Sequence, residues 1–263
     1  DPETGDVRPI GIEFPDDTTV RQAERAARWP VEQIQRLARL ALTAERLAAD
    51  RAIISMVGTA DEVLEALAIR PDGVYVDGTY GRGGHAAAIL QRLDQNGRLL
   101  VMDKDPQAIA WARQAHGTDA RVTIIHDDYA QMLPQLQQRG IAQLVDGVLL
   151  DLGVSSPQLD DAGRGFSFQQ NGPLDMRMNP EQGVSASEWL MNASEKEIAG
   201  VLWELGEERF SKRIARRIVE YRQQQPITDT ATLAALISDC VPAGKQRKHP
   251  ATRSFQAIRI RVN

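Results

Sequence analysis

The middle of the chain alternates short apolar runs with longer amphipathic segments. Apolar runs at 74–77, 98–103, 122–126 and 144–151 predict buried strands. Apolar positions at helical spacing predict helices at 61–69, 86–93 and 131–139, and Asp105-Pro106 predicts the start of another. Because strands and helices alternate with short connections, the pattern predicts an α/β domain with a parallel sheet.

Polar side chains stand where these predicted strands end. Asp77, Asp103 and Asp151 close three of the strands, and Tyr129 follows the strand at 122–126. Right-handed crossovers place the carboxyl ends of parallel strands at one edge of the sheet. We therefore expect these four side chains to line one crevice.

A glycine-rich loop follows Asp77 and leads into the helix predicted at 86–93. Strand, glycine loop and helix in this order bring backbone close to a nucleotide-like ligand in many α/β proteins. A Cβ atom there would block the ligand or forbid a positive φ. Asp103 lies 22 residues after Gly81, where an acidic residue accepts hydrogen bonds from ribose hydroxyls. Loop and acid together favour a nucleotide-like cofactor.

The pattern after Asp151 differs, because it is almost wholly helical. Residues 152–158 predict a loop, Ser185/Glu188 and Ser194/Glu197 fit capping boxes, and 209–222 and 228–237 predict helices. Residues 159–250 thus predict an all-helical domain inserted into an α/β domain at 56–158. We expect that domain to resume at 251–263 in a basic, strand-like run. Residues 1–55 predict a helical extension of unknown role.

Charge limits how the chain can contact nucleic acid. The net charge is −5, so any such contact must use local basic patches. Two segments qualify: 209–222 has six Arg or Lys and one acid, and 245–263 has six Arg or Lys and no acid. A solvated surface is the alternative reading of such runs. The candidates for phosphate contact are Arg213, Arg216, Arg217, Lys248 and Arg253.

Cysteine and histidine usage narrows the class of protein. The single cysteine, Cys240, cannot form an internal disulfide and fits a reducing compartment. No apolar run approaches the 18 residues of a membrane span, so we expect a cytoplasmic protein without membrane contact. The four histidines and one cysteine show no ligand spacing for zinc, and we expect no metal site.

Six ordered motifs resemble the ribosomal RNA small subunit methyltransferase H family, the MraW type. They lie at 77–85, 151–160, 165–168, 172–178, 206–210 and 248–253, and the resemblance covers about residues 61–263. It implies a Rossmann-like class I methyltransferase domain with an inserted helical domain. It also implies S-adenosylmethionine-dependent methylation of cytidine N4 in the decoding region of 16S rRNA, within the small ribosomal subunit.

The resemblance also implies roles for individual residues. The implied cofactor contacts are Gly83, Gly84, His85, Asp103, Tyr129, Asp151 and Gln158. The cytosine amino lone pair is delocalised into the ring, so a carboxylate that accepts an N4 hydrogen would help the reaction. Asp151 is the best-placed candidate, although it could serve cofactor binding alone.

Nearby side chains have competing readings. Ser155 and Ser156 show no paired base, so we expect them to cap a loop rather than act as nucleophiles. Phe166 and Phe168 could stack a flipped base or belong to the core of the insertion.

Two other functions stay open on the sequence alone. Gly81-Arg-Gly-Gly-His-Ala86 fits the looser dinucleotide pattern, so an NAD-dependent oxidoreductase is one alternative. The other is a non-catalytic RNA-binding fragment, because the family continues past Asn263 into further sheet strands. Without those strands we expect an unpaired strand edge beside the crevice, and a chain that is unstable and inactive alone. The sequence leaves the oligomeric state open.

Overall fold

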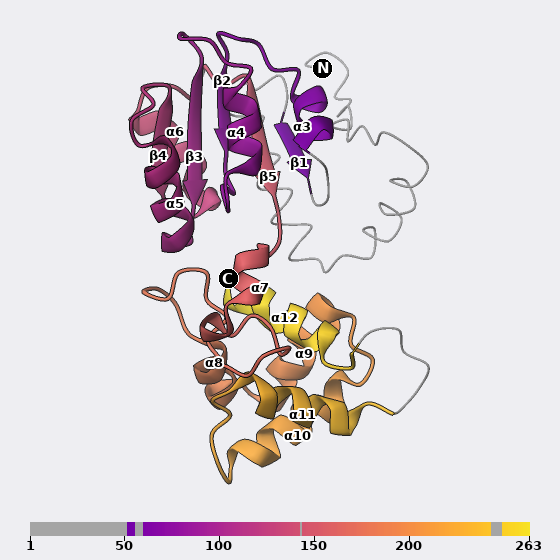
Figure 1. The fold of residues 1–263 in the computed structure, drawn as a ribbon. Coiled ribbons are helices and arrows are strands. Elements are labelled where there is room, and N and C mark those ends of the chain that lie inside the picture. The colour runs from indigo at the N-terminus through magenta and orange to yellow at the C-terminus, as the bar shows by residue number, and fades with distance from the viewer. Residues whose placement is uncertain (1–51, 56–59, 143, 243–248) are drawn as a thin grey trace, which may run out of the picture.

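The computed structural model describes residues 52–55, 60–142, 144–242 and 249–263, which form two units. One unit is a parallel sheet with helices on its faces, and the other is a group of helices (Figure 1). The chain passes from the sheet unit to the helical unit after β5 through the short helix α7, and α12 lies at the side of the helical unit that faces the sheet (Figure 1).

The described residues form a five-stranded sheet in the order β1-β5-β2-β3-β4, with every pair parallel. The strands are β1 (Ala52–Ser55), β2 (Val74–Asp77), β3 (Arg98–Asp103), β4 (Val122–His126) and β5 (Gly147–Asp151). The predicted parallel α/β sheet is therefore confirmed, although β5 begins three residues later than its apolar run.

Successive strand residues face opposite sides of the sheet and build two cores. Tyr75 and Leu99 pack with helices α3 (Ala60–Leu67), α4 (Gly84–Leu90) and α5 (Pro106–His116). Val76 and Leu100 pack on the other side with α6 (Met132–Gln138), which follows the short 3₁₀ helix η1 (Tyr129–Gln131). Burial on both faces explains why these strands are continuous apolar runs.

Strand β1 corrects two expectations. Residues 52–55 belong to the predicted helical extension, but they pair with β5 in register Ala52 to Val148. Their two isoleucines favour an extended backbone, and β5 offers a free edge there. Because β5 is paired on both sides, the expected unpaired edge beside the crevice does not lie at this strand. The rest of the predicted extension, 1–51, lies outside the described residues.

The helical unit has its own core. It contains α8 (Ala186–Asn192), α9 (Glu195–Gly206), α10 (Ser211–Arg222), α11 (Thr230–Cys240) and α12 (Thr252–Val262). Their apolar side chains form one cluster, in which Leu202, Ile218 and Leu233 are fully buried. The predicted helices at 209–222 and 228–237 are confirmed, and none of the described helices is long and apolar enough to cross a membrane.

The two predicted capping boxes have different outcomes. At Ser185 the box is complete, since Glu188 Oε2 accepts from the Ser185 N–H at 3.0 Å and Ser185 Oγ accepts from the Glu188 N–H at 3.2 Å. At Ser194 only the forward bond forms. Glu197 instead accepts from the Trp189 indole at 3.0 Å, which ties α8 to α9.

Two local predictions are wrong. Residues 156–160 form helix α7 (Ser156–Asp160), followed by η2 (Ala162–Arg164), rather than continuing a loop. Residues 252–262 form helix α12 rather than a strand of the α/β domain. The alternating Ile-Arg-Ile-Arg-Val run has the strand period, but Phe255, Ile258 and Val262 also share one helical face. That face packs on the core of the helical unit, so burial decides the outcome.

Both phenylalanines of the 165–168 motif are packing residues. Phe166 is fully buried. Phe168 packs its ring 4.8 Å from Phe255 and 4.6 Å from His249. The structure thus favours the core reading over base stacking.

Candidate functional site

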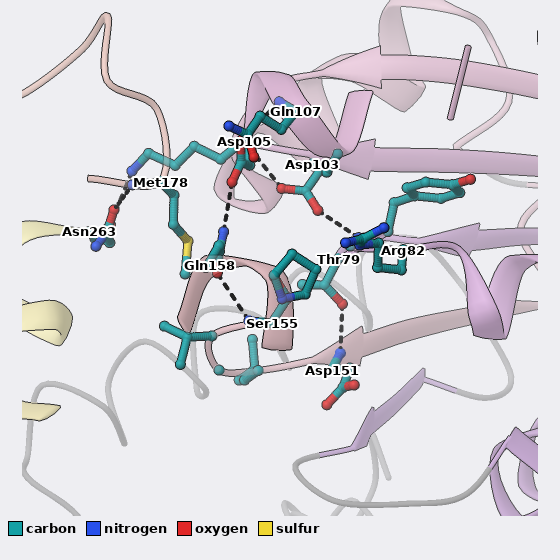
Figure 2. Close-up of a pocket in the computed structure, with 18 of the residues that line it drawn as sticks. Thr79, Arg82, Asp103, Asp105, Gln107, Asp151, Ser155, Gln158, Met178 and Asn263 are labelled. Carbon is teal, nitrogen blue, oxygen red and sulfur yellow. Dashed lines mark hydrogen bonds between the residues drawn. The ribbon is translucent and has the colours of Figure 1, made fainter. Parts of the chain in front are cut away.

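A cleft of about 790 Å³ lies between the carboxyl ends of the strands and the helical unit (Figure 2). We call its two sides the sheet wall and the helical wall. The sheet wall comprises the loops after β2, β3, β4 and β5, from which Asp103, Tyr129 and Asp151 line the cleft. The helical wall comprises Met178 and four residues of the α12 segment, which are Gln256, Arg259, Ile260 and Asn263.

Most of the predicted cofactor-binding residues come together here. Gly84, His85, Asp103, Tyr129, Asp151 and Gln158 all line the cleft. Gly83 does not. It is buried at the N-cap of α4 with φ +76°, and a Cβ on it would lie 2.4 Å from the Tyr80 hydroxyl. The structure therefore gives Gly83 a conformational role in the loop.

The Asp103 carboxylate holds the glycine loop through backbone hydrogen bonds. Its Oδ2 accepts the Gly81 N–H at 2.8 Å and its Oδ1 accepts the Asp105 N–H at 2.8 Å. Burial raises the pKa of the Asp103 carboxyl, and these backbone hydrogen bonds oppose that rise. A carboxylate offers about four acceptor positions, and the backbone N–H groups of Gly81, Asp105 and Lys104 do not use all of them, so acceptor capacity remains for a ligand in the cleft.

The expectation that Asp77 lines the crevice is wrong. Its side chain is 1% exposed beneath the loop, where Oδ1 accepts the Thr79 N–H at 3.1 Å. Its Oδ2 has no hydrogen-bond partner among the described residues. Burial raises the pKa of Asp77 to about 7, and the charges of Asp103 and Asp151 add to the rise. This carboxyl supports the loop without being able to reach a ligand.

Asp151 ends β5 with an exposed side chain at the cleft (Figure 2). Its backbone N–H donates to Thr79 Oγ1 at 2.7 Å, which joins the strand end to the glycine loop. The end of β5 is therefore held beside the loop, and the carboxylate it carries is open to an incoming group.

Gln158 joins two loops of the sheet wall, those after β3 and β5, as well as lining the cleft. Its Nε2 donates to Asp105 Oδ2 at 2.8 Å, and its Oε1 accepts the Ser155 N–H at 3.0 Å (Figure 2). Ser155 is the N-cap of helix α7, whereas the sequence predicts that it caps a loop. Asp105 in turn caps α5 by accepting the Gln107 N–H at 2.9 Å.

Arg164 completes this link from the helical unit. It is buried, and its Nη1 lies 3.0 Å from Asp105 Oδ2, within ion-pair distance but without hydrogen-bond geometry. Its Nη2 donates to the Met178 carbonyl at 2.8 Å and to the Arg177 carbonyl at 3.1 Å. One buried network thus runs from the first turn of α5 into the loop at the helical wall.

The sequence reasoning missed the helical wall altogether. Its residues from the α12 segment are spaced i, i+3, i+4 and i+7, so they share one face of the helix. That spacing is a signal in the sequence, but the alternating run that overlaps it favours a strand. Asn263 uses its amide to hold the loop before α8, since it accepts the Met178 N–H at 2.6 Å and donates to the Met176 carbonyl at 2.7 Å.

A second missed feature lies at the rim. The Arg82 guanidinium sits 4.6 Å from the centre of the Trp111 ring, and both residues line the cleft. Trp111 is 46% exposed, which is unusual for a tryptophan with an apolar core beneath its helix.

The predicted RNA-binding residues lie apart from one another. Arg213, Arg216 and Arg217 belong to α10, at the end of the helical unit farthest from the sheet, and Arg216 and Arg217 are exposed there (Figure 1). Arg253 is exposed on α12, where it donates to the Glu207 carbonyl at 3.0 Å. Lys248 lies outside the described residues.

Within the described ranges, no group of three or more His, Cys, Asp or Glu side chains is arranged to hold a metal ion. The geometry is that of a nucleotide-type cleft at the carboxyl ends of parallel strands. Residues 57–263 match the MraW methylase family. The chain belongs to that family. The Rossmann-like fold with a helical unit fits this membership.

Curated relatives agree with the family. The chain is 57% identical over 203 residues to ribosomal RNA small subunit methyltransferase H of Coxiella burnetii strain Dugway 5J108-111. It is 59% identical over 204 residues to the protein of that name from Thioalkalivibrio sulfidiphilus, and 59% over 202 residues to that from Xanthomonas euvesicatoria. Each alignment covers 77% of this chain, but only 66%, 65% and 59% of the respective relatives.

Proposed function

We propose that this protein transfers a methyl group from S-adenosylmethionine to N4 of a cytidine in the decoding region of 16S rRNA, in the small ribosomal subunit. The observation that carries the proposal is the cleft, in which a glycine loop and two strand-end carboxylates meet in a chain of the MraW methylase family. The names of the relatives support ribosomal RNA as the substrate class.

The sheet wall fits the methyl donor. The remaining acceptor positions of Asp103 suit ribose hydroxyls. Tyr129 lines the cleft from the segment after β4, where an adenine ring would pack. A Cβ atom added at Gly84 would meet no described atom within 4 Å, so the backbone there borders open space. When bound, the donor supplies an electrophilic methyl group, and the protein supplies position.

Asp151 fits the acceptor chemistry. An exposed carboxylate beside the loop can accept a hydrogen from the cytidine N4 amino group, which localises the nitrogen lone pair and balances the developing positive charge. Because Thr79 holds the Asp151 backbone, the strand end that carries this acceptor keeps its place beside the glycine loop.

Donor binding is the first test. Calorimetric titration should show that S-adenosylmethionine binds and NAD does not, which separates the methyltransferase from the oxidoreductase alternative. Asp103→Ala removes charge-assisted hydrogen bonds worth roughly 1.5–3 kcal/mol, so donor affinity should fall about tenfold or more. Unchanged affinity in a folded variant would remove Asp103 from the site.

Methyl transfer is the second test, and it also addresses the alternative of a non-catalytic RNA-binding protein. Asp151→Asn should lower the single-turnover rate on small-subunit particles about a hundredfold, the lower range for a group that accepts a proton in the transition state. Asp160→Asn, which replaces an exposed carboxylate on α7, is the matched control. Donor binding with no transfer by the unchanged protein would favour the RNA-binding alternative.

A further inference from the structure

Arg259 is a partly buried cation on the helical wall. It lies on the face of α12 that lines the cleft, with Gln256 and Ile260 beside it. One guanidinium N–H donates to the Phe166 carbonyl at 3.2 Å. In the part of the chain that the structure describes, no carboxylate forms an ion pair with it. Most of its five N–H donors thus remain for a ligand.

Arg164 and Arg222 of the same unit have fuller sets of acceptors, since Arg222 donates to the Leu190 and Ala193 carbonyls. Arg164 is more deeply buried than Arg259, yet it has a carboxylate 3.0 Å away and two backbone carbonyls as acceptors. Burial lowers the pKa of the Arg259 guanidinium, and among the described residues no neighbouring negative charge opposes that effect. Since an arginine keeps its proton, its desolvation stays uncompensated until an anion enters the cleft.

We propose that Arg259 binds a phosphate group of the substrate nucleotide, so that the helical wall orients the RNA and the sheet wall holds the methyl donor. The planar guanidinium matches phosphate through two parallel hydrogen bonds. On the sheet wall the carboxylates Asp103 and Asp151 disfavour phosphate at the strand ends, and the cation Lys104 already pairs with Asp128 at 3.3 Å. Gln256 offers an amide to a base or sugar edge, and Ile260 offers an apolar surface. This inference rests on the proposed function.

The donor carries an anion too, its amino acid carboxylate, and the test separates the two sources. Arg259→Gln and Arg259→Lys are compared with Arg261→Gln. Arg261 is exposed on the same helix, pairs with Glu197 at 3.4 Å and does not line the cleft. Each variant is titrated with a fluorescently labelled fragment of 16S rRNA from the decoding region, with S-adenosylmethionine, and with methylthioadenosine, which lacks the carboxylate.

Arg259→Gln should weaken RNA binding about tenfold and lower the log–log salt slope by about 0.7–0.9, the value for one lost phosphate contact. Arg259→Lys should recover part of the affinity, because it keeps the charge but loses the paired geometry. Binding of S-adenosylmethionine and of methylthioadenosine should stay close to that of the unchanged protein in both. Arg261→Gln should resemble the unchanged protein.

Three results overturn the assignment: equal RNA affinity for Arg259→Gln and Arg261→Gln, a loss of S-adenosylmethionine binding with methylthioadenosine unaffected, or no RNA binding by the unchanged protein. The second result would assign Arg259 to the donor carboxylate. None of these readouts requires methyl transfer. Failure of the inference can therefore be told apart from failure of the proposed reaction.

Discussion

The two walls of the cleft differ in chemistry and in construction. The sheet wall consists of loops from four strand ends, and it presents acceptors such as Asp103 and Asp151. The helical wall is mainly one face of a single helix, and it presents the cation Arg259, an amide and an apolar side chain. The contrast teaches that the strand ends suit hydroxyl and amino groups, whereas the helical wall suits an anion, although Arg82 and Lys104 also bring cations to the sheet wall.

The walls are joined by the ion pair of Asp105 and Arg164, and breaking it should have the largest effect on stability. Arg164→Met leaves a buried carboxylate without its counterion, which should lower the free energy of unfolding by about 3–5 kcal/mol. Urea denaturation measures the change. Adding Asp105→Asn to Arg164→Met should recover much of the loss, because no uncompensated charge remains.

Arg216→Gln serves as the control for that experiment. Its pair with Glu195 spans 3.7 Å between side chains that are 69% and 45% exposed, so the expected change is below about 1 kcal/mol. If Arg164→Met lowers the free energy of unfolding no more than Arg216→Gln does, the ion pair of Asp105 and Arg164 does not hold the walls together.

The raised pKa of Asp77 makes the free energy of unfolding depend on pH. An unfolded chain ionises this carboxyl near pH 4, whereas the folded chain retains its proton up to a pKa of about 7. Its contribution to stability is therefore full below about pH 4 and is lost as pH rises through 7. The upper limit of the loss is about 4 kcal/mol, since each tenfold change in proton affinity is worth about 1.4 kcal/mol.

Asp77→Asn should abolish that dependence. Unfolding of the variant and of the unchanged protein should cost similar free energy near pH 4, and the variant should be the more stable by up to about 4 kcal/mol at about pH 8. Urea denaturation across this range measures the difference. A constant difference between the two proteins at every pH would contradict the raised pKa.

Much of the fold could be predicted from local sequence patterns. Strands β2 and β3 are apolar runs that end in an aspartate, and β4 is a short run rich in β-branched residues. The helices between them predict parallel pairing. Strand β1 and helix α12 could not be predicted, because tertiary contacts decide both. Residues 52–55 need the free edge of β5, and 252–262 need the apolar surface of α9.

The residues of the site also divide into those that local sequence patterns predict and those that depend on packing. Asp103 and Asp151 can be predicted because strand ends in a parallel sheet converge whatever the details of packing. The same rule places Asp77 with them, but the sequence carries no signal for how deeply the loop buries it. In the sequence Arg259 is only one charge in a basic run. Its role depends on which face of α12 meets the cleft, and this follows from packing.

The smallest expected effect concerns Arg213, Arg216 and Arg217, which lie on α10 away from both walls. If they contact RNA phosphate beyond the target nucleotide, replacing all three with Gln should lower the log–log salt slope by about 0.7–0.9 per lost contact. Each replacement should weaken binding less than Arg259→Gln does, because guanidinium groups outside the cleft remain hydrated and their charge is screened. Anisotropy titrations with small-subunit particles at several salt concentrations measure the slope. A slope equal to that of the unchanged protein would assign these charges to solvent, and RNA recognition would then be confined to the cleft and its helical wall.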